Sequence, residues 1–211
     1  MISITIIIVV LTCIISFLAF SNNTIIDKLI FYPPAIANRN EWYRFFSCGL
    51  IHADIAHLAF NMISLYLFGR LVESVFVQIF AETGELLYGL MYVTALGACL
   101  LPTYQAQKEN FHYRSLGASG AVSAVVFAGI FLFPTQEIGF MFIPPIIPGF
   151  IFGPIYLFIS VYMSEKGGDN INHSAHFWGA IYGIAFLVAA SFALSDFNPF
   201  LNFVNQIKSY F

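Results

Sequence analysis

Long apolar segments separated by short polar ones run along the whole chain. The apolar runs lie at about 3–20, 55–72, 86–102, 117–133, 146–163 and 175–195. Each run is close to the roughly 20 residues that a helix needs to cross the hydrocarbon core of a bilayer. The pattern therefore predicts an all-α polytopic membrane protein with six transmembrane helices, which we expect to form a single domain over residues 1–211.

The first apolar run is expected to be a retained membrane helix rather than a secretory signal. MISITIIIVVLTCIISFLAF has no Lys or Arg ahead of its apolar residues, and no small-x-small cleavage pattern follows it. The run also exceeds the roughly 7–15 residues usual for the apolar part of a signal peptide.

Two segments depart from the simple alternation. The linker at 21–54 leads into FFSCGLIHADIAH, which is too apolar for a solvated loop, so we expect a first loop embedded in the membrane. The stretch FPTQEIGFMFIPPIIPG at 133–149 is rich in proline, which interrupts helices, so helix five should begin only after it. The prolines and glycines there predict that helix five is the least firmly packed of the six and a lateral opening for a substrate.

Composition supports a membrane protein over a soluble one. The chain is 59% hydrophobic and 9% charged, whereas a soluble domain averages about 25% charged residues. A net charge of −3 without any basic cluster argues against a nucleic-acid partner. Cys13, Cys48 and Cys99 are scattered, and we expect them to be apolar filler rather than disulfides or metal ligands.

Three polar motifs fall at corresponding ends of predicted helices. HLAFN at 57–61, GASG at 117–120 and SAHFWG at 174–179 open helices two, four and six. These helices cross the membrane in the same direction, so the three motifs should meet on one face. Polar groups inside a bilayer are expensive and mark function by default.

The convergence supplies the parts of a covalent acyl-transfer site. Ser119 would be a nucleophile and His176 its base. His57 and Asn61 have i, i+4 spacing and share a helix face, where both can donate to an oxyanion together with the backbone N–H of Ser119. Taken singly, each of these residues is more often structural, and only their coincidence favours catalysis.

The residues around this set favour a dyad and a close helix contact. Carboxylates near these helix ends lie only just outside them, at Asp54 and Asp169, so we expect a dyad rather than a triad. Gly117 and Gly120 allow a tight entry into helix four. Small residues on helices four and six would let the two backbones approach closely: Gly120, Ala124 and Ala128 on one side, Gly179 and Gly183 on the other.

Four motifs in order resemble those of a known family. Trp42-Tyr43-Arg44, HLAFN, GASG and AHFWGAIYG fit the patterns WxR, HxxxN, GxSG and AHxxGxxxG of the rhomboid family of intramembrane serine proteases. The resemblance covers about residues 40–190. GxSG alone is weak because hydrolases of other folds also carry a Gly-flanked serine. Four motifs on the appropriate helices are specific.

The resemblance implies an intramembrane serine endopeptidase. It implies a dyad of Ser119 and His176, with His57 and Asn61 as oxyanion donors. The substrates would be other membrane proteins, cleaved in or near their transmembrane segments within the lipid bilayer. No cofactor is implied.

The resemblance also assigns supporting roles and exposes one departure. Trp42 and Arg44 would organise the membrane-embedded first loop, and His52 would lie near the site. Glu73, at the end of FGRLVE, looks structural. Family members often carry an aromatic residue one turn after the serine, packed on the catalytic histidine, but this chain has Ser123 there. Orientation of the histidine would then fall to another ring, such as Trp178 or Tyr182.

Charge and resemblance disagree on orientation. The resemblance implies a multi-pass protein of the bacterial inner membrane whose site opens to the extracytoplasmic side. Six cations lie in the loops on the predicted active-site side and two on the other, which by the positive-inside rule favours the cytoplasm. Arg44 belongs to loop structure, so we give the resemblance more weight. The six are Lys28, Arg39, Arg44, Lys108, Arg114 and Lys166, and the two are Arg70 and Lys208.

Three other functions fit less well. A catalytically silent membrane chaperone, binding protein or transporter could use the same scaffold, but silent relatives usually lack the serine or histidine. A metal or haem protein would lack HExxH and cysteine ligands, so we expect no metal site. An aspartyl intramembrane protease would need GxGD, which KGGD at 166–169 is not. In the metal or haem protein, the candidate ligands would be His52, His57, His173 and His176.

Overall fold

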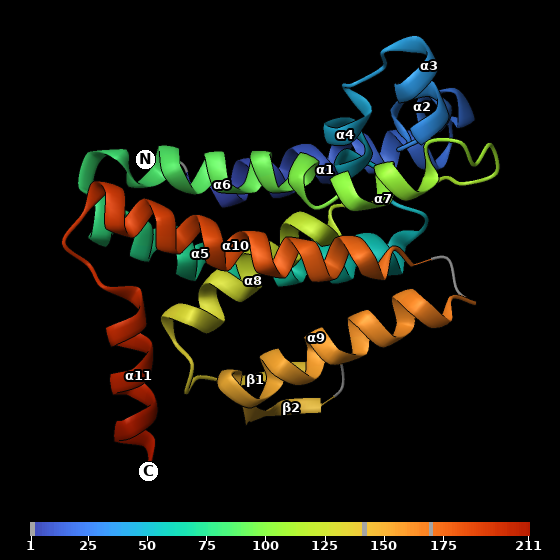
Figure 1. Cartoon of the computed structure of the whole chain (residues 1–211). Coiled ribbons are helices and arrows are strands. Elements are labelled where there is room, and N and C mark those ends of the chain that lie inside the picture. Colours follow the sequence, from blue (N-terminus) through green and yellow to red (C-terminus); the bar gives the residue numbers. More distant parts are fainter. Residues whose placement is uncertain (1–2, 141–142, 169–170) are drawn as a thin grey trace.

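The computed structural model describes residues 3–140, 143–168 and 171–211 and is mostly helical (Figure 1). Each predicted apolar run contains a helix. These helices are α1 (Ile4–Phe20), α5 (Ile55–Phe80), α6 (Gly84–Ala98), α8 (Ser119–Leu132), α9 (Gly149–Lys166) and α10 (His173–Leu194). Two are longer or more interrupted than expected: α5 runs to Phe80, and the third run continues after α6 into a short α7 (Leu101–Gln107).

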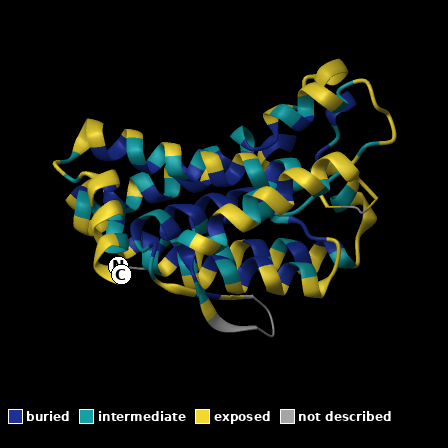
Figure 2. Ribbon diagram, turned by 60° about the horizontal axis from the view of Figure 1, so that its bottom comes forward, coloured by how far each residue is buried: buried dark blue, intermediate teal, exposed yellow. Residues whose placement is uncertain are grey.

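Helix α8 occupies the centre of the bundle. It contacts α5, α6, α9 and α10, and most of its residues are buried (Figure 2). The core around it joins Leu65 and Val72 of α5, Tyr88 of α6 and Leu187 of α10. Small residues such as Ala121, Ala124 and Ala128 allow neighbours to approach this helix on several sides.

The first loop folds into short helices at one end of the bundle (Figure 1). They are α2 (Asn23–Leu29), α3 (Pro33–Arg39), α4 (Arg44–Ser47) and the 3₁₀ turn η1 (Cys48–Leu50). α3 begins with prolines, which suit the first helical positions, and ends at Asn40 in the left-handed conformation at φ 58°. Phe31, Ile36 and Phe45 from this loop form a buried cluster with Leu100 and Ala175.

Glu73 of α5 anchors the start of α1. Its carboxylate accepts hydrogen bonds from the backbone N–H groups of Ile4, at 2.6 Å, and Thr5, at 3.2 Å, and from the Ser3 hydroxyl. These N–H groups belong to the first turn of α1, where they lack intrahelical partners. A carboxylate there also complements the positive end of the helix dipole, which suits the structural role expected for Glu73.

The expectation of a purely helical fold is wrong at one place. β1 (Glu137–Phe140) and β2 (Ile143–Pro148) form a two-stranded antiparallel sheet, with Glu137 opposite Pro148. Proline cannot donate to a helix and pushes the preceding residue towards extended backbone, which favours strand over helix here. Helix α9 begins directly after the sheet, at Gly149, as the prolines predicted.

A final helix, α11 (Pro199–Tyr210), was not predicted. It crosses the end of the bundle opposite the first loop (Figure 1). Its start carried a readable signal, because Asn198 accepts from the N–H of Leu201 at 3.0 Å and a proline occupies the first helical position. Asn202 and Gln206 donate to the carbonyl of Leu132, at 2.9 and 2.7 Å, so this helix caps the C-terminal end of α8.

Length and hydropathy identify fewer membrane-crossing helices than the sequence pattern does. Within the described residues, the stretch Ile55–Gln107, which holds α5, α6 and α7, and the helix His173–Leu194 are long and apolar enough to cross a membrane. Ile4–Phe20 and Ser119–Leu132 are apolar but shorter. Six spans therefore stay a prediction.

Candidate active site

Ser119 and His176 are in direct contact. The Oγ of Ser119 lies 2.6 Å from Nε2 of His176, although 57 positions separate the two residues in the chain. Ser119 is the first residue of α8, and His176 lies in the first turn of α10. Both residues are only partly buried. A hydroxyl within hydrogen-bond reach of an imidazole is the geometry of an activated nucleophile.

The contact depends on close approach of α8 and α10. A Cβ atom on Gly179 would lie 2.0 Å from the carbonyl oxygen of Gly120, and one on Gly183 would lie 2.0 Å from that of Ala124. A backbone carbonyl cannot move aside as a flexible side chain can. Glycine is therefore required at both positions for α10 to come this near, and the two small-residue stripes meet as the sequence indicated.

The start of α10 is fixed by Asn172. Its Oδ1 accepts from the N–H of Ala175 at 3.0 Å and from the Thr103 hydroxyl at 3.1 Å. Asn172 thus caps α10 and ties it to α7 in the same step. Asp169, which the sequence places just before helix six, lies outside the described residues.

Gly117 shapes the entry into α8. It has φ +113°, a conformation that side-chain-bearing residues rarely adopt. A Cβ there would lie 2.7 Å from Cε1 of His57, so the imidazole packs directly on the backbone just before Ser119. The N–H of Gly117 donates to the carbonyl of Cys48 at 2.9 Å, which joins this turn to the first loop.

His57 and Asn61 lie on one face of α5 near this turn. Asn61 is buried, and its Nδ2 donates to the carbonyl of His57 at 3.0 Å. The second N–H of an amide nitrogen remains available for another acceptor by its chemistry. Asp54, considered near the site, accepts from the N–H of His57 at 2.7 Å and is the N-cap of α5.

His52 is completely buried between α1 and the turn before Ser119. Its Nδ1 lies 3.0 Å from the Ser16 hydroxyl, which donates to the carbonyl of Leu50 at 2.9 Å. Its Nε2 accepts from the N–H of Ala118 over 3.5 Å, a long contact. Because the hydroxyl hydrogen of Ser16 points to Leu50, this pattern fits a neutral His52 with its hydrogen on Nδ1.

The electrostatics of His52 agree with that assignment. Burial, and secondarily the neighbouring His57, lower the pKa of His52 to about 3, while Asp54 acts weakly in the opposite direction. The ring is therefore uncharged near neutral pH and links α1 to the turn before Ser119. Ser16 was missed from the sequence, since nothing in the apolar first run distinguishes it.

Arg44 and Trp42 organise the first loop away from the reacting atoms. Arg44 is buried, and its Nη1 donates to the carbonyls of Asp27, at 2.9 Å, and Ile30, at 2.8 Å. Its Nε pairs with Glu41, which the sequence did not single out. The Trp42 ring stacks on Phe45 with centroids 5.9 Å apart.

The position one turn after Ser119 is used in an unexpected way. Ser123 lies 3.0 Å, oxygen to oxygen, from the hydroxyl of Tyr156 on α9. Among the described ring contacts, the ring beside His176 is His173, at 5.9 Å between centroids. Trp178 packs on Phe177, and the hydroxyl of Tyr182 donates to Thr94 at 2.7 Å, so both suggested rings have other described partners.

Metal ligation finds no support in the described part of the chain. No group of three or more His, Cys, Asp or Glu side chains there is placed to hold a metal ion. His52 and His57 pack edge to face at 4.9 Å between ring centroids, and His52 is already engaged by Ser16 and Ala118.

Two proteins, one from a plant and one from a bacterium, are similar to this chain over more than half of its length. RHOMBOID-like protein 12, mitochondrial, of Arabidopsis thaliana is 32% identical over 139 residues, which is 61% of this chain and 40% of that protein. The "Putative rhomboid protease YdcA" of Bacillus subtilis (strain 168) is 29% identical over 164 residues, 74% of this chain and 71% of that protein. The chain thus spans about two fifths of the plant relative and most of the bacterial one.

Agreement with the family extends across the site. The sequence profile of the Rhomboid domain matches residues 39–191, a range that includes Ser119, His176 and the part of the first loop that follows α3. The members of this family are integral membrane proteins. The chain therefore belongs to the rhomboid family.

Proposed function

We propose that this protein is an intramembrane serine endopeptidase that works through Ser119 and His176. The contact of 2.6 Å between Oγ and Nε2 carries the proposal, because a rhomboid scaffold without this pair would lack a nucleophile and base. Membership of the family and similarity to a bacterial relative named as a rhomboid protease support the same function.

The proposed hydrolysis has two steps, acylation of Ser119 and hydrolysis of the acyl-enzyme. Nε2 of His176 takes the Ser119 proton while Oγ attacks the scissile carbonyl, and the resulting imidazolium then gives that proton to the leaving amine. Water next attacks the acyl-enzyme carbonyl while Nε2 of His176 takes a proton from it. The ester bond between the carbonyl carbon and Oγ then breaks, and the imidazolium returns its proton to Oγ, which restores the Ser119 hydroxyl. The carboxylic acid fragment and the amine fragment are the products.

Oxyanion stabilisation is assigned to three donors around Gly117. They are the backbone N–H of Ser119 and the side chains of His57 and Asn61. The packing of His57 on Gly117 and the burial of Asn61 beside it support this role. Pre-positioned donors in a water-poor site stabilise the tetrahedral intermediate strongly, because they require no reorganisation.

The depth of the site suits cleavage of transmembrane substrates. α8 has 14 residues and is therefore about 21 Å long, shorter than the roughly 30 Å hydrocarbon core of a bilayer. In a bundle of six spans, a central helix of that length whose C-terminal end lies at the opposite membrane surface would place Ser119 within the bilayer. We place this opening on the extracytoplasmic side of a bacterial inner membrane, with substrates arriving laterally past α9.

Replacement of the nucleophile tests this function. Ser119→Ala should lower cleavage of a model transmembrane substrate by several orders of magnitude while the thermal unfolding profile stays as in the wild type. A fluorophosphonate probe should label the wild type at Ser119, and should still label Ser119 in Ser123→Ala, the matched control on the same helix. Retention of more than a few per cent of activity in Ser119→Ala would overturn the assignment.

The alternative is a catalytically silent rhomboid-like chaperone or binding protein. That function predicts that the wild type is neither labelled by the probe nor able to cleave any transmembrane substrate, while it still associates with membrane proteins. Labelling at Ser119 together with loss of cleavage in Ser119→Ala excludes it.

A further inference from the structure

An open hollow lies on the outer side of the first loop, away from Ser119. Its volume is about 420 Å³, within the range of about 300–1,000 Å³ common for small-ligand sites. Residues from two separate parts of the chain line it: Thr24, Asp27, Lys28, Ile30, Tyr32, Arg39, Arg44 and Arg114. The proposed peptidase mechanism uses none of its open surface.

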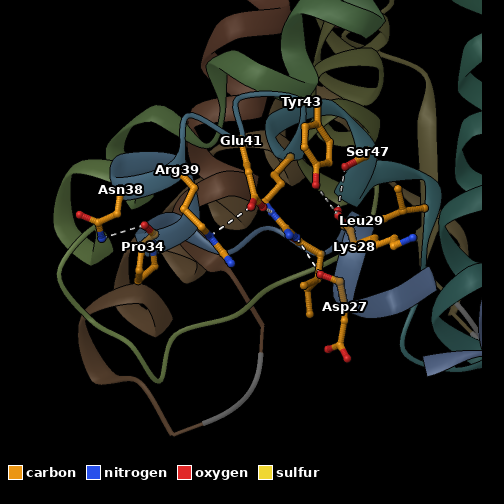
Figure 3. Close-up of polar contacts among 11 residues, drawn as sticks. Asp27, Lys28, Leu29, Pro34, Asn38, Arg39, Glu41, Tyr43 and Ser47 are labelled. Carbon is orange, nitrogen blue, oxygen red and sulfur yellow. Dashed lines mark hydrogen bonds and ion pairs between the residues drawn. The ribbon is translucent and has the colours of Figure 1, made fainter. Parts of the chain in front are cut away.

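The hollow carries an excess of positive charge. Four cationic side chains line it, and two carboxylates balance them in part. Glu41 is shared, because it pairs with Arg39 at 3.1 Å and with Arg44 (Figure 3). Asp27 pairs with Arg114 at 3.2 Å, but both side chains are more than half exposed, so this ion pair is weak and can exchange for another anion.

Two of the three arginines have described partners that orient them, and Arg44 is the more firmly held. Arg44 is fixed by the two backbone carbonyls and Glu41 and is only 5% exposed. The Arg114 guanidinium lies over the Tyr32 ring, 5.3 Å from its centroid. Guanidinium groups match the oxygens of phosphate in pairs, and fixed ones lose less entropy on binding. The arginines that line the hollow therefore suit a phosphate group better than a single carboxylate group as the bound anion.

The hollow also bridges two segments that matter for the catalytic turn. Phe31 and Ser115 exchange two backbone hydrogen bonds, of 3.0 and 3.1 Å, directly beside Arg114 and Tyr32. Ser115 lies four residues before Ser119. An anion held between Arg39 on the first loop and Arg114 on the second segment would strengthen the junction between them.

We propose that this hollow binds a phosphate group, presented by the headgroup of an anionic phospholipid or by a free phosphate ion. Arg39, Arg114 and Lys28 are the ligand-contacting cations, and Arg44 supplies fixed positive charge behind them. Binding stabilises the folded protein and does not depend on peptidase activity. It also gives the cations on this face a role other than reporting membrane orientation.

Free phosphate is tested on the full-length protein in uncharged detergent. Thermal unfolding is followed while inorganic phosphate replaces chloride at constant pH and ionic strength, which removes the general effect of screening. The wild type should show a saturable rise in Tm. Arg39→Gln/Arg114→Gln should bind phosphate about tenfold more weakly or worse, because charged hydrogen bonds are lost. Lys108→Gln/Lys166→Gln removes the same charge from the same face outside the hollow and should behave as the wild type.

Lipid headgroups are tested with the same variants in vesicles of phosphatidylcholine alone and of phosphatidylcholine mixed with phosphatidylglycerol. A rise in Tm with phosphatidylglycerol but not with inorganic phosphate identifies the lipid as the source, and a rise with inorganic phosphate alone identifies the free ion. If the double variant does not fold, Arg39→Gln replaces it, since Glu41 keeps Arg44 as a partner. The proposal is overturned if neither probe raises the Tm of the wild type, or if the hollow variant responds as the control does.

Discussion

Helix α8 has two neighbours that it meets in opposite ways. Towards α10 the contact is backbone to backbone, with Gly179 and Gly183 facing the carbonyls of Gly120 and Ala124 at distances that exclude any side chain. Towards α9 the contact is made by large side chains, and a Cβ on Gly153 would meet its nearest neighbour, Phe127, only at 3.5 Å. Buried residues of α9 are few: Gly149, Gly153 and Ser160.

The contacts of α8 with α10 and with α9 differ in how closely the helices are packed, and the proposed function would use the two contacts differently. The Ser119–His176 contact lies on the α10 side, where rigid packing can hold a nucleophile and its base to within a fraction of an ångström. The α9 side is held by ring contacts such as that between Phe127 and Tyr156, and by the bond from Tyr156 to Ser123. A contact of that kind can open without disturbing the dyad. In the proposed peptidase, the contact of α8 with α10 would stay fixed, and its contact with α9 would be the one that separates to admit a substrate.

The largest expected effect on stability and activity comes from a substitution at the close contact between α8 and α10. Gly179→Ala places a methyl group 2.0 Å from the Gly120 carbonyl oxygen, so α10 must move away from α8. Overpacking of this kind costs about 1–3 kcal/mol or more, and a displacement near 1 Å can lower the rate by about 10²-fold. Unfolding free energy and kcat/KM for a transmembrane substrate are the measurements.

The matched control is Gly153→Ala on the loose side, where the added methyl group has room and alanine favours the helix. It should leave unfolding free energy unchanged or slightly higher. Equal losses of unfolding free energy from the two substitutions would contradict this difference, because α8 would then be packed equally tightly against α9 and α10.

An intermediate effect on stability is expected from His52, which links α1 to the turn before Ser119. Its pKa is about 3 in the folded protein and about 6.5 in an unfolded chain. Between these values the unfolded chain binds a proton that the folded protein excludes, so stability is full above about pH 6.5 and falls as pH drops towards 3. One such group contributes about 1.4 kcal/mol per pH unit in that window.

Unfolding free energy measured from pH 7 to pH 4 checks this slope. His52→Gln should remove the contribution of one proton from it, whereas His112→Gln, on an exposed loop, should keep the slope of the wild type. A wild-type slope unaffected by His52→Gln would show that His52 takes up its proton without unfolding, and the bridge to Ala118 would not be fixed.

The smallest expected effect on stability comes from a substitution at the contact between α8 and α9. Tyr156→Phe removes the hydrogen bond to the buried Ser123 and should cost about 1 kcal/mol. Hydrogen exchange should rise in α9 but not in α10, because only the α9 contact is weakened. Tyr162→Phe, at an exposed position of the same helix, is the control and should change neither. A parallel rise in α10 would show that the two sides of α8 do not act independently.

Much of the architecture followed from the one-dimensional pattern. Each apolar run contains a helix, since the length and hydrophobicity of a segment are local properties that can be read from the sequence. The proline-rich segment correctly delayed α9 to Gly149 but was not recognised as a hairpin, because pairing between strands is decided across a turn. α11 escaped notice because its apolar face is too short for a membrane span, although Asn198 and Pro199 marked its start.

The sequence by itself determined which residue types stand at the helix ends and which faces are small enough to meet. Gly120, Gly179 and Gly183 could be selected from spacing alone, because helix geometry fixes which residues share a face. Only the tertiary structure decided the partners across helices: Ser16 for His52, Tyr156 for Ser123, and the carbonyls of Asp27 and Ile30 for Arg44. Such contacts depend on how whole helices pack and on which backbone groups a loop leaves unpaired, and neither is encoded in the spacing of residues within one segment.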